Sequence, residues 1–309
     1  MGSKTIKKYG ELRIHIGAHK TATTHLQDTL NEIRTELLEY KINYIPRHTG
    51  RPRLLKATPW GIARLKYKLL FGFQKRKLLI TGLFPDSPLD ETIILSEENI
   101  LGSILDELST RPYQNIDRKL AFIKQLSKDF SVKIFFSIRS FNDVLPGAYV
   151  TALRFRPKEA VLAKAKLLSD LDNGERPSWV EVIKRLKSVL PTTEIKIWTQ
   201  EDYRNHSDQI ICQFLGKKIK NIPTILSPRE TITPSCDAIS QIENMIQGFE
   251  TMPTNWQAMC DQIYASKPAK KNSEKYTFLD ETLKEQLQKS YEDDLIELRK
   301  FLSAGLIEV

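Results

Sequence analysis

The 309-residue sequence predicts an α/β fold with a central parallel sheet flanked by helices, and two observations lead to this prediction. Runs with the composition and alternation of strands occur at 12–16, 92–95, 132–138 and 194–198. After each run, beyond a loop, apolar residues recur with the spacing of a helix. Strands that alternate with helices form parallel sheets, because each helix carries the chain back to the same edge.

Helices are expected in chain order wherever this spacing occurs. In the segment 142–154, Pro146 and Gly147 are expected to interrupt the helix. The last part of the chain, 223–309, is polar and helical in pattern, so we predict one domain over 1–309 with a helical C-terminal region. The expected helices span about 22–38, 60–73, 117–130, 142–154, 179–190, 206–215 and 283–302.

The net charge of +9 has a local origin. The segment 51–85 holds nine basic residues and no acidic ones, and the remaining charges cancel. We interpret this segment as a basic helical insertion for an anionic partner, with a peripheral membrane contact through 51–77. A nucleic-acid polymer is not expected, because no recognition motif accompanies the charge. The basic residues are Arg51, Arg53, Lys56, Arg64, Lys66, Lys68, Lys75, Arg76 and Lys77.

Several classes of protein are disfavoured by what the sequence lacks. No apolar run approaches the roughly 20 residues that span a bilayer, and the basic N-terminus has no secretory pattern. Cys212, Cys236 and Cys260 are widely spaced and form no metal-ligand pattern. We therefore expect a cytoplasmic protein, in part at the inner face of the membrane, with no metal site. The sequence leaves the oligomeric state open.

The loop 17–24, between the first strand and its helix, carries the strongest chemical signal. Gly17 allows a tight exit from the strand, Lys20 adds a mobile positive charge, and Thr21, Thr23 and Thr24 add hydroxyl groups. Backbone N–H groups at a helix start favour anions, so this composition predicts a phosphate site. The loop is not a Walker A sequence, since Ile14 and His19 replace its two glycines.

The string 14–27, IHIGAHKTATTHLQ, closely resembles the 5′-phosphosulfate loop of bacterial sulfotransferases that use 3′-phosphoadenosine 5′-phosphosulfate (PAPS). Ala22 departs from the usual glycine. The run 94–98, ILSEE, is similar to a family strand that ends in Ser-x-Glu. Arg139, at a strand end, resembles the arginine of the 3′-phosphate motif, but Gly147 stands where that motif has a serine. The resemblance implies a P-loop-like sulfotransferase fold.

The resemblance also implies roles for these residues. Lys20 would stabilise the oxygen between phosphorus and sulfur, and Arg139 would bind the 3′-phosphate, with one hydroxyl contact missing at Gly147. The catalytic pair would be Lys20 and Glu98, with Glu98 as the base for an acceptor hydroxyl. Strand alternation is expected to point Glu97 away from Glu98. The remaining donor-binding residues would be Gly17, His19, Thr21, Ala22, Thr23 and Thr24.

The implied activity is transfer of a sulfuryl group from PAPS to a hydroxyl of an acceptor, such as a carbohydrate or glycolipid. Glu97, His19 and His25 remain alternative bases. One alternative function is a P-loop-type kinase that would use Glu97 or Glu98 to hold Mg²⁺. A non-catalytic binder of acidic glycan or a membrane surface, acting through the basic segment, is the alternative from another class.

Overall fold

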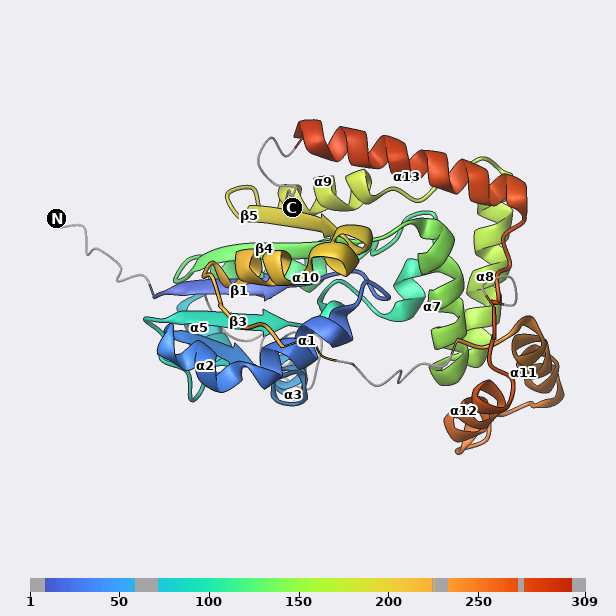
Figure 1. The fold of residues 1–309 in the computed structure, drawn as a ribbon, viewed down its shortest axis with the longest axis horizontal. Coiled ribbons are helices and arrows are strands. Elements are labelled where there is room, and N and C mark those ends of the chain that lie inside the picture. The colour runs from blue at the N-terminus through green and yellow to red at the C-terminus, as the bar shows by residue number, and fades with distance from the viewer. Residues whose placement is uncertain (1–8, 59–71, 224, 226–232, 272–274, 302–309) are drawn as a thin grey trace.

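The computed structural model describes residues 9–58, 72–223, 225, 233–271 and 275–301. Its described part contains a five-stranded, fully parallel sheet with the order β2-β3-β1-β4-β5, which confirms the predicted α/β class (Figure 1). The strands are β1 (Glu11–His15), β2 (Ile42–Ile45), β3 (Thr92–Ser96), β4 (Ser131–Ile138) and β5 (Glu194–Thr199).

Two apolar clusters hold helices against the two faces of this sheet. On one face, Ile94 and Phe135 pack with side chains of α1 (Thr23–Glu32), α2 (Arg34–Glu39) and α10 (Gln200–Leu215). The other face carries the larger cluster. Successive strand side chains point to opposite faces, so both faces of the sheet are buried. The helices of the larger cluster include α3 (Arg47–Ala57), α5 (Gly72–Leu83), α6 (Ile116–Leu126) and α9 (Trp179–Val189).

A group of helices lies beyond the carboxyl ends of the strands. In Figure 1, α7 (Phe141–Phe155) and α8 (Pro157–Asp172) stand at that end of the sheet. The later helices α11 (Cys236–Gly248) and α12 (Trp256–Ser266) lie next to them, and α13 (Glu281–Phe301) runs along one side. Two short 3₁₀ turns, η1 (Glu98–Ile100) and η2 (Ile104–Glu107), follow β3. None of the described helices is long and apolar enough to cross a membrane.

Several elements differ from the sequence prediction. Strand β2 was not predicted, and α7 continues through Pro146, whose side chain is buried. Helix α10 begins at Gln200, not near 206, and the backbone at His206 leaves helical geometry within it. The predicted helix at 60–73 falls almost entirely outside the described residues.

The basic segment is partly neutralised by acidic residues from outside it. Arg53 forms an ion pair with Asp86 at 2.9 Å, and Arg76 pairs with Asp129 at 2.9 Å. The helices α3 and α5 also contribute buried side chains to the larger core cluster. The described part of this segment is therefore integrated into the domain by packing as well as by charge.

A buried carboxylate attaches α13 to the sheet side of the domain. Asp294 accepts hydrogen bonds from the Ser178 hydroxyl at 2.7 Å and from the Trp179 backbone N–H at 2.6 Å, at the start of α9. Burial raises the pKa of Asp294, against the effect of these donors. This contact holds α13 against α9. The first turns of α13 carry Lys284, which lines the site described below.

The Asp294→Ala substitution should lower the free energy of unfolding by about 2 kcal/mol, because it leaves the Trp179 N–H buried without its acceptor. Denaturant titration of the parent and variant measures this difference. Asp293, the exposed neighbour on the same helix, provides the matched control, and Asp293→Ala should change stability by less than about 0.5 kcal/mol. Equal losses in both variants would show that the Asp294 contact contributes nothing specific.

Candidate functional site

The order of the strands places the site at the carboxyl end of β1. From β1 the chain first builds β2 and β3 on one side and later β4 on the other, so the connections leave β1 in opposite directions. A crevice forms at such a switch point in open α/β sheets, and ligands bind there. The loop 17–22, the segment after β3 and Arg139 after β4 all meet at this place.

A chain of buried polar side chains lies directly beneath the loop. The His15 ring is 2.9 Å from the Ser96 hydroxyl through Nδ1 and 3.0 Å from the Ser137 hydroxyl through Nε2. Ser137 Oγ is in turn 2.6 Å from the Thr21 hydroxyl, which donates to the Ala18 carbonyl at 2.6 Å. Adjacent strand ends are thereby connected to the loop. Burial lowers the pKa of His15 to about 4, so its ring is neutral at pH 7.

Gly17 is required by close approach. A Cβ atom at this position would overlap Ser137 Oγ and would lie 2.5 Å from His15 Nε2. Gly17 is not among the glycines with positive φ, so its role differs from the turn flexibility expected from the sequence. Any side chain here would displace the polar chain beneath the loop.

Two loop residues adopt a left-handed backbone. Lys20 has φ of 64° and Ala22, which precedes α1, has φ of 63°. Glycine reaches this region at little cost, whereas other L-residues lose roughly 1–2 kcal/mol there. The replacement of the motif's glycine by Ala22 therefore adds backbone strain as well as a methyl group.

The three loop threonines have different surroundings. The Thr21 hydroxyl is committed to the internal contacts described above. Thr23 is only 8% exposed, and its Oγ1 is buried with no hydrogen-bond partner among the described residues. Thr24 is partly exposed. No described side chain caps α1, so the Thr23 hydroxyl lies at an uncapped helix start, an arrangement suited to an anion.

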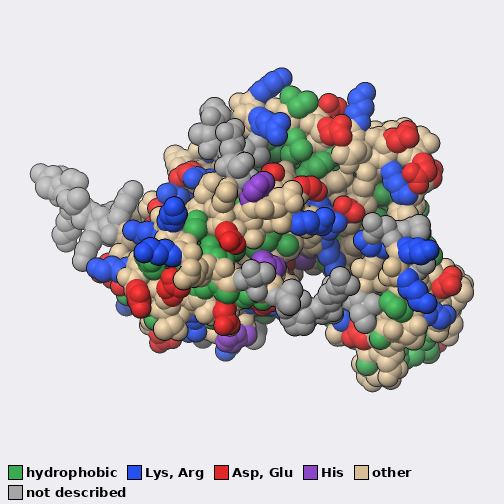
Figure 2. All heavy atoms as spheres, viewed as in Figure 1, with side chains coloured by type: hydrophobic (Ala, Val, Ile, Leu, Met, Phe, Trp, Pro, Cys, Tyr) green, Lys and Arg blue, Asp and Glu red, His purple; other side chains and the backbone are tan. Residues whose placement is uncertain are grey.

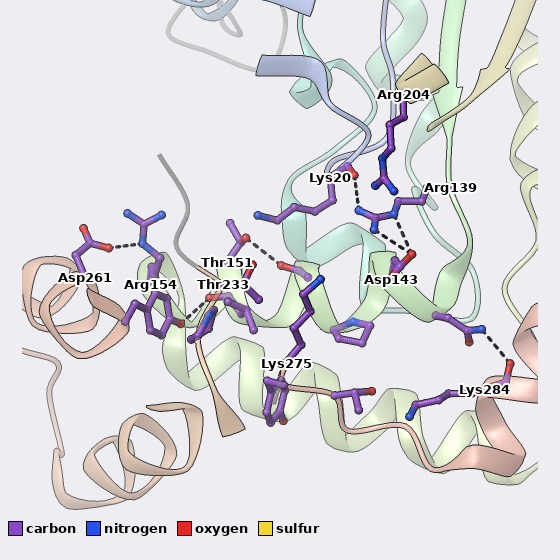
Figure 3. Close-up of a pocket in the computed structure, with 18 residues that line it drawn as sticks. Lys20, Arg139, Asp143, Thr151, Arg154, Arg204, Thr233, Asp261, Lys275 and Lys284 are labelled. Atoms are coloured by element: carbon purple, nitrogen blue, oxygen red, sulfur yellow. Dashed lines mark hydrogen bonds and ion pairs between the residues drawn. The ribbon is translucent and has the colours of Figure 1, made fainter. Parts of the chain in front are cut away.

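A pocket of about 850 Å³ lies between the loop and the C-terminal helices (Figure 3). Figure 2 shows Lys and Arg side chains gathered where the surface is hollowed between the sheet and the α11–α12 end. Tyr264, Tyr276 and Pro146 supply apolar surface. Among the described lining residues, two are acidic, Asp143 and Asp261, and six are basic, namely Lys20, Arg139, Arg154, Arg204, Lys275 and Lys284.

Three predicted residues meet in this pocket. Lys20, Arg139 and Gly147 all line it, and Lys20 extends into it in Figure 3. Arg139 donates to the Lys20 carbonyl at 3.1 Å and pairs with Asp143 at 3.0 Å. A Cβ atom on Gly147 would lie 3.3 Å from the stem of Lys20. Glycine at 147 therefore leaves room for Lys20, the lysine that the resemblance predicts to be catalytic.

The charges around the pocket favour an anionic ligand. Burial lowers the pKa of Lys20. The Glu107 carboxylate raises this pKa, whereas the positive charges of Arg154 and Arg139 lower it further. Arg154 is paired with Asp261 at 2.7 Å. Because several cations share one partly buried space, an anion with more than one charged group would relieve their repulsion.

Glu98 does not line this pocket. It pairs with Arg51 at 2.9 Å, and its other oxygen is 3.4 Å from Gln27 Nε2. Burial would raise the pKa of Glu98, but the Arg51 guanidinium holds it below its ordinary value. The expectation that Glu97 points away was wrong, because the same guanidinium binds Glu97 at 2.7 Å. Strand β3 ends at Ser96, so alternation does not extend to these two residues.

The other candidate bases have defined contacts. The His25 ring is 2.9 Å from the Tyr203 hydroxyl of α10. His19 lies against Glu107 on η2, a residue that the sequence did not single out because nothing local indicates its burial. The sequence also missed Arg154, Arg204, Lys275 and Lys284, which have no motif in common and are widely separated along the chain.

Comparison of the chain with protein-family profiles, with curated proteins and with solved structures finds no match.

Ala22→Gly should raise the free energy of unfolding by about 1 kcal/mol, because glycine relieves the left-handed strain before α1. Thermal or denaturant unfolding measures the change. Ala18→Gly, a substitution in the same loop at a residue without positive φ, is the control and should destabilise. A loss of stability in Ala22→Gly would show that the Ala22 methyl packing outweighs the strain.

The buried His15 should make the protein less stable in acid. Between pH 6.5 and about 4 the unfolded chain binds a proton at this ring and the folded chain does not, so stability falls as the pH falls. The loss should approach about 3 kcal/mol. Denaturant titrations at pH 7 and 4.5 on the parent and His15→Gln measure it, and the variant should lose less stability across this range. Identical pH dependence in both proteins would contradict the assignment.

Proposed function

We propose that this protein transfers a sulfuryl group from PAPS to a hydroxyl group of an acceptor, with a carbohydrate or glycolipid as the acceptor class that the sequence resemblance favours. The observation that supports it most is the convergence of Lys20, Arg139 and Gly147 in one cation-lined pocket at the end of β1. Lys20 comes from one motif of the resembled family, and Arg139 and Gly147 come from another, with Lys20 and Arg139 lying 119 positions apart in the sequence.

The residues present fit a donor with two separated anionic groups. The start of α1, with the buried Thr23 hydroxyl, would hold one group beside Lys20. Arg139 would bind the other with its planar guanidinium, once it shares or releases Asp143. Tyr264 and Tyr276 provide aromatic surface in the same pocket, as a nucleotide base requires.

The donor, when bound, supplies an activated sulfuryl group. In the transfer, the bond from sulfur to the phosphate oxygen breaks while a bond from sulfur to the acceptor oxygen forms. Lys20 would stabilise the negative charge that develops on the departing phosphate oxygen. Glu98 follows β3 and lies outside the pocket, so it would accept the proton of an acceptor that binds on the β3 side of the loop. Arg51 keeps Glu98 ionised, although that pairing also makes it a weaker base.

The contacts of the acidic residues also bear on the kinase alternative. Glu97 and Glu98 were its candidate Mg²⁺ ligands, and both carboxylates bind the Arg51 guanidinium. Metal binding would have to displace that arginine from two ion pairs. This arrangement favours sulfuryl transfer over phosphoryl transfer.

Adenosine 3′,5′-bisphosphate, the expected product, should bind the protein without added metal, as measured by titration calorimetry. Arg139→Ala should weaken binding roughly tenfold to a hundredfold, because a charge-assisted contact is lost. Lys20→Ala should weaken it similarly. Arg156→Ala is the matched control, since Arg156 is exposed and its ion pair within the described residues is a local one with Glu159.

Adenosine 5′-phosphate should bind more weakly to the parent, and Arg139→Ala should reduce that difference. The sulfotransferase proposal fails if the bisphosphate does not bind, or if only ATP with Mg²⁺ does. The second result would instead support a kinase.

A further inference from the structure

Glu107 is a buried carboxylate that the proposed chemistry has not used. It lies at the end of η2 with 0% exposure, and its Oε1 accepts the His19 backbone N–H at 2.7 Å. The Tyr113 hydroxyl donates to the same oxygen. Oε2 is buried with no hydrogen-bond partner among the described residues. The contacts that Glu107 makes are those of an acceptor, because both donors point to Oε1.

An ionised carboxylate at this depth requires a positive partner. Removing such a charge from water costs several kcal/mol unless an opposite charge lies close by. The nearest positive candidate among the described residues is the His19 ring, whose Nδ1 is 3.2 Å from Glu107 Oε1, close enough for an ion pair but not aligned as a hydrogen bond, with the His19 side chain 12% exposed. An unprotonated Nδ1 this close to the carboxylate would be repelled by it, so the contact favours a proton on Nδ1.

Asn99 faces the opposite edge of the His19 ring and determines the protonation state of Nε2. The Asn99 amide nitrogen donates to Glu97 Oε1 at 2.6 Å, which turns its carbonyl oxygen away from Glu97. That oxygen is 3.4 Å from His19 Nε2. An acceptor therefore faces Nε2, and Nε2 must also carry a proton. With both ring nitrogens protonated, His19 is an imidazolium.

We infer that Glu107 is a positioning residue of the loop, which fixes the backbone at His19 and holds the His19 ring as an imidazolium beside Lys20. The loop then carries two adjacent cations, and His19 is not available as the base that the sequence left open. The consequence for ligand affinity rests on the proposed function, whereas the charge of the ring does not.

The charges around His19 agree with this inference. Burial opposes the charged ring, but Glu107 and, more weakly, Glu98 raise the pKa of His19 above its ordinary value. Lys20 adjoins it on the loop, and Arg51 lies behind Glu98 and partly offsets that carboxylate. The raised pKa means that the imidazolium contributes stability below pH 6.5, and that this contribution is lost as the pH rises through the folded value.

The test is long-range ¹H–¹⁵N correlation NMR on the full chain labelled with ¹⁵N-histidine, between pH 5 and 9. The chain has five histidines, and His19 is assigned by the signals missing in His19→Gln. We expect both His19 ring nitrogens to be protonated at pH 7, while His15 stays neutral in the same spectra. Glu107→Gln should lower the pKa of His19 by at least about one unit, a tenfold loss of proton affinity.

Glu98→Gln is the matched variant, since it removes the more distant carboxylate and should shift His19 less than Glu107→Gln does. A neutral His19 ring in the parent at pH 7 overturns the inference, and that measurement needs no variant to fold. An unchanged titration in a folded Glu107→Gln protein overturns it as well.

Binding of adenosine 3′,5′-bisphosphate provides a separate readout. Its affinity should fall as the pH rises through the measured His19 pKa, and Glu107→Gln should weaken it about tenfold at pH 7. A protonated His19 in a protein that binds no bisphosphate would refute the proposed function and leave the charge assignment standing. A neutral His19 in a protein that binds the bisphosphate would refute the charge assignment and leave the proposed function standing.

Discussion

The His15 imidazole links the structural elements on which the site depends. Its two nitrogens meet Ser96 at the end of β3 and Ser137 near the end of β4, while its own strand, β1, leads into the loop. The Ser137 hydroxyl also forms a hydrogen bond with the Thr21 hydroxyl inside the loop. Each of these groups is buried, so each depends on its neighbours for hydrogen bonding. The loop thus rests on a polar support that also sets the relative position of three strands.

This support explains several residue choices that seem unrelated in the sequence. Gly17 has no side chain because His15 and Ser137 occupy the space that a side chain would need. The loop closes in a left-handed conformation at Lys20 and Ala22, which returns the backbone to the start of α1. Arg139 then binds the Lys20 carbonyl from the neighbouring strand end. The loop is thus held by Ser137 beneath it, by the Thr21 hydroxyl within it and by Arg139 beside it.

Sequence reasoning succeeded for the parallel sheet, which followed from local alternating patterns. Lys20, Arg139 and Gly147, which the motifs singled out, line one pocket, and their roles in it stay predictions. It failed at β2, which is only four residues long and too short for a reliable period, and at Pro146, which lies buried within α7 instead of interrupting it. The acidic partners of Arg51 and Arg76 lie outside the basic segment. The charge of the segment alone therefore overstated how many of its basic side chains are available to an anionic partner.

The pocket is lined from opposite ends of the described chain. Lys20 follows the first strand, whereas Lys275 and Lys284 belong to the last segments. During synthesis the loop and its polar support can form once β4 has emerged, but the wall that faces them cannot assemble until α13 has left the ribosome. A ligand of this pocket would stabilise only the finished protein and could not assist the early steps of folding.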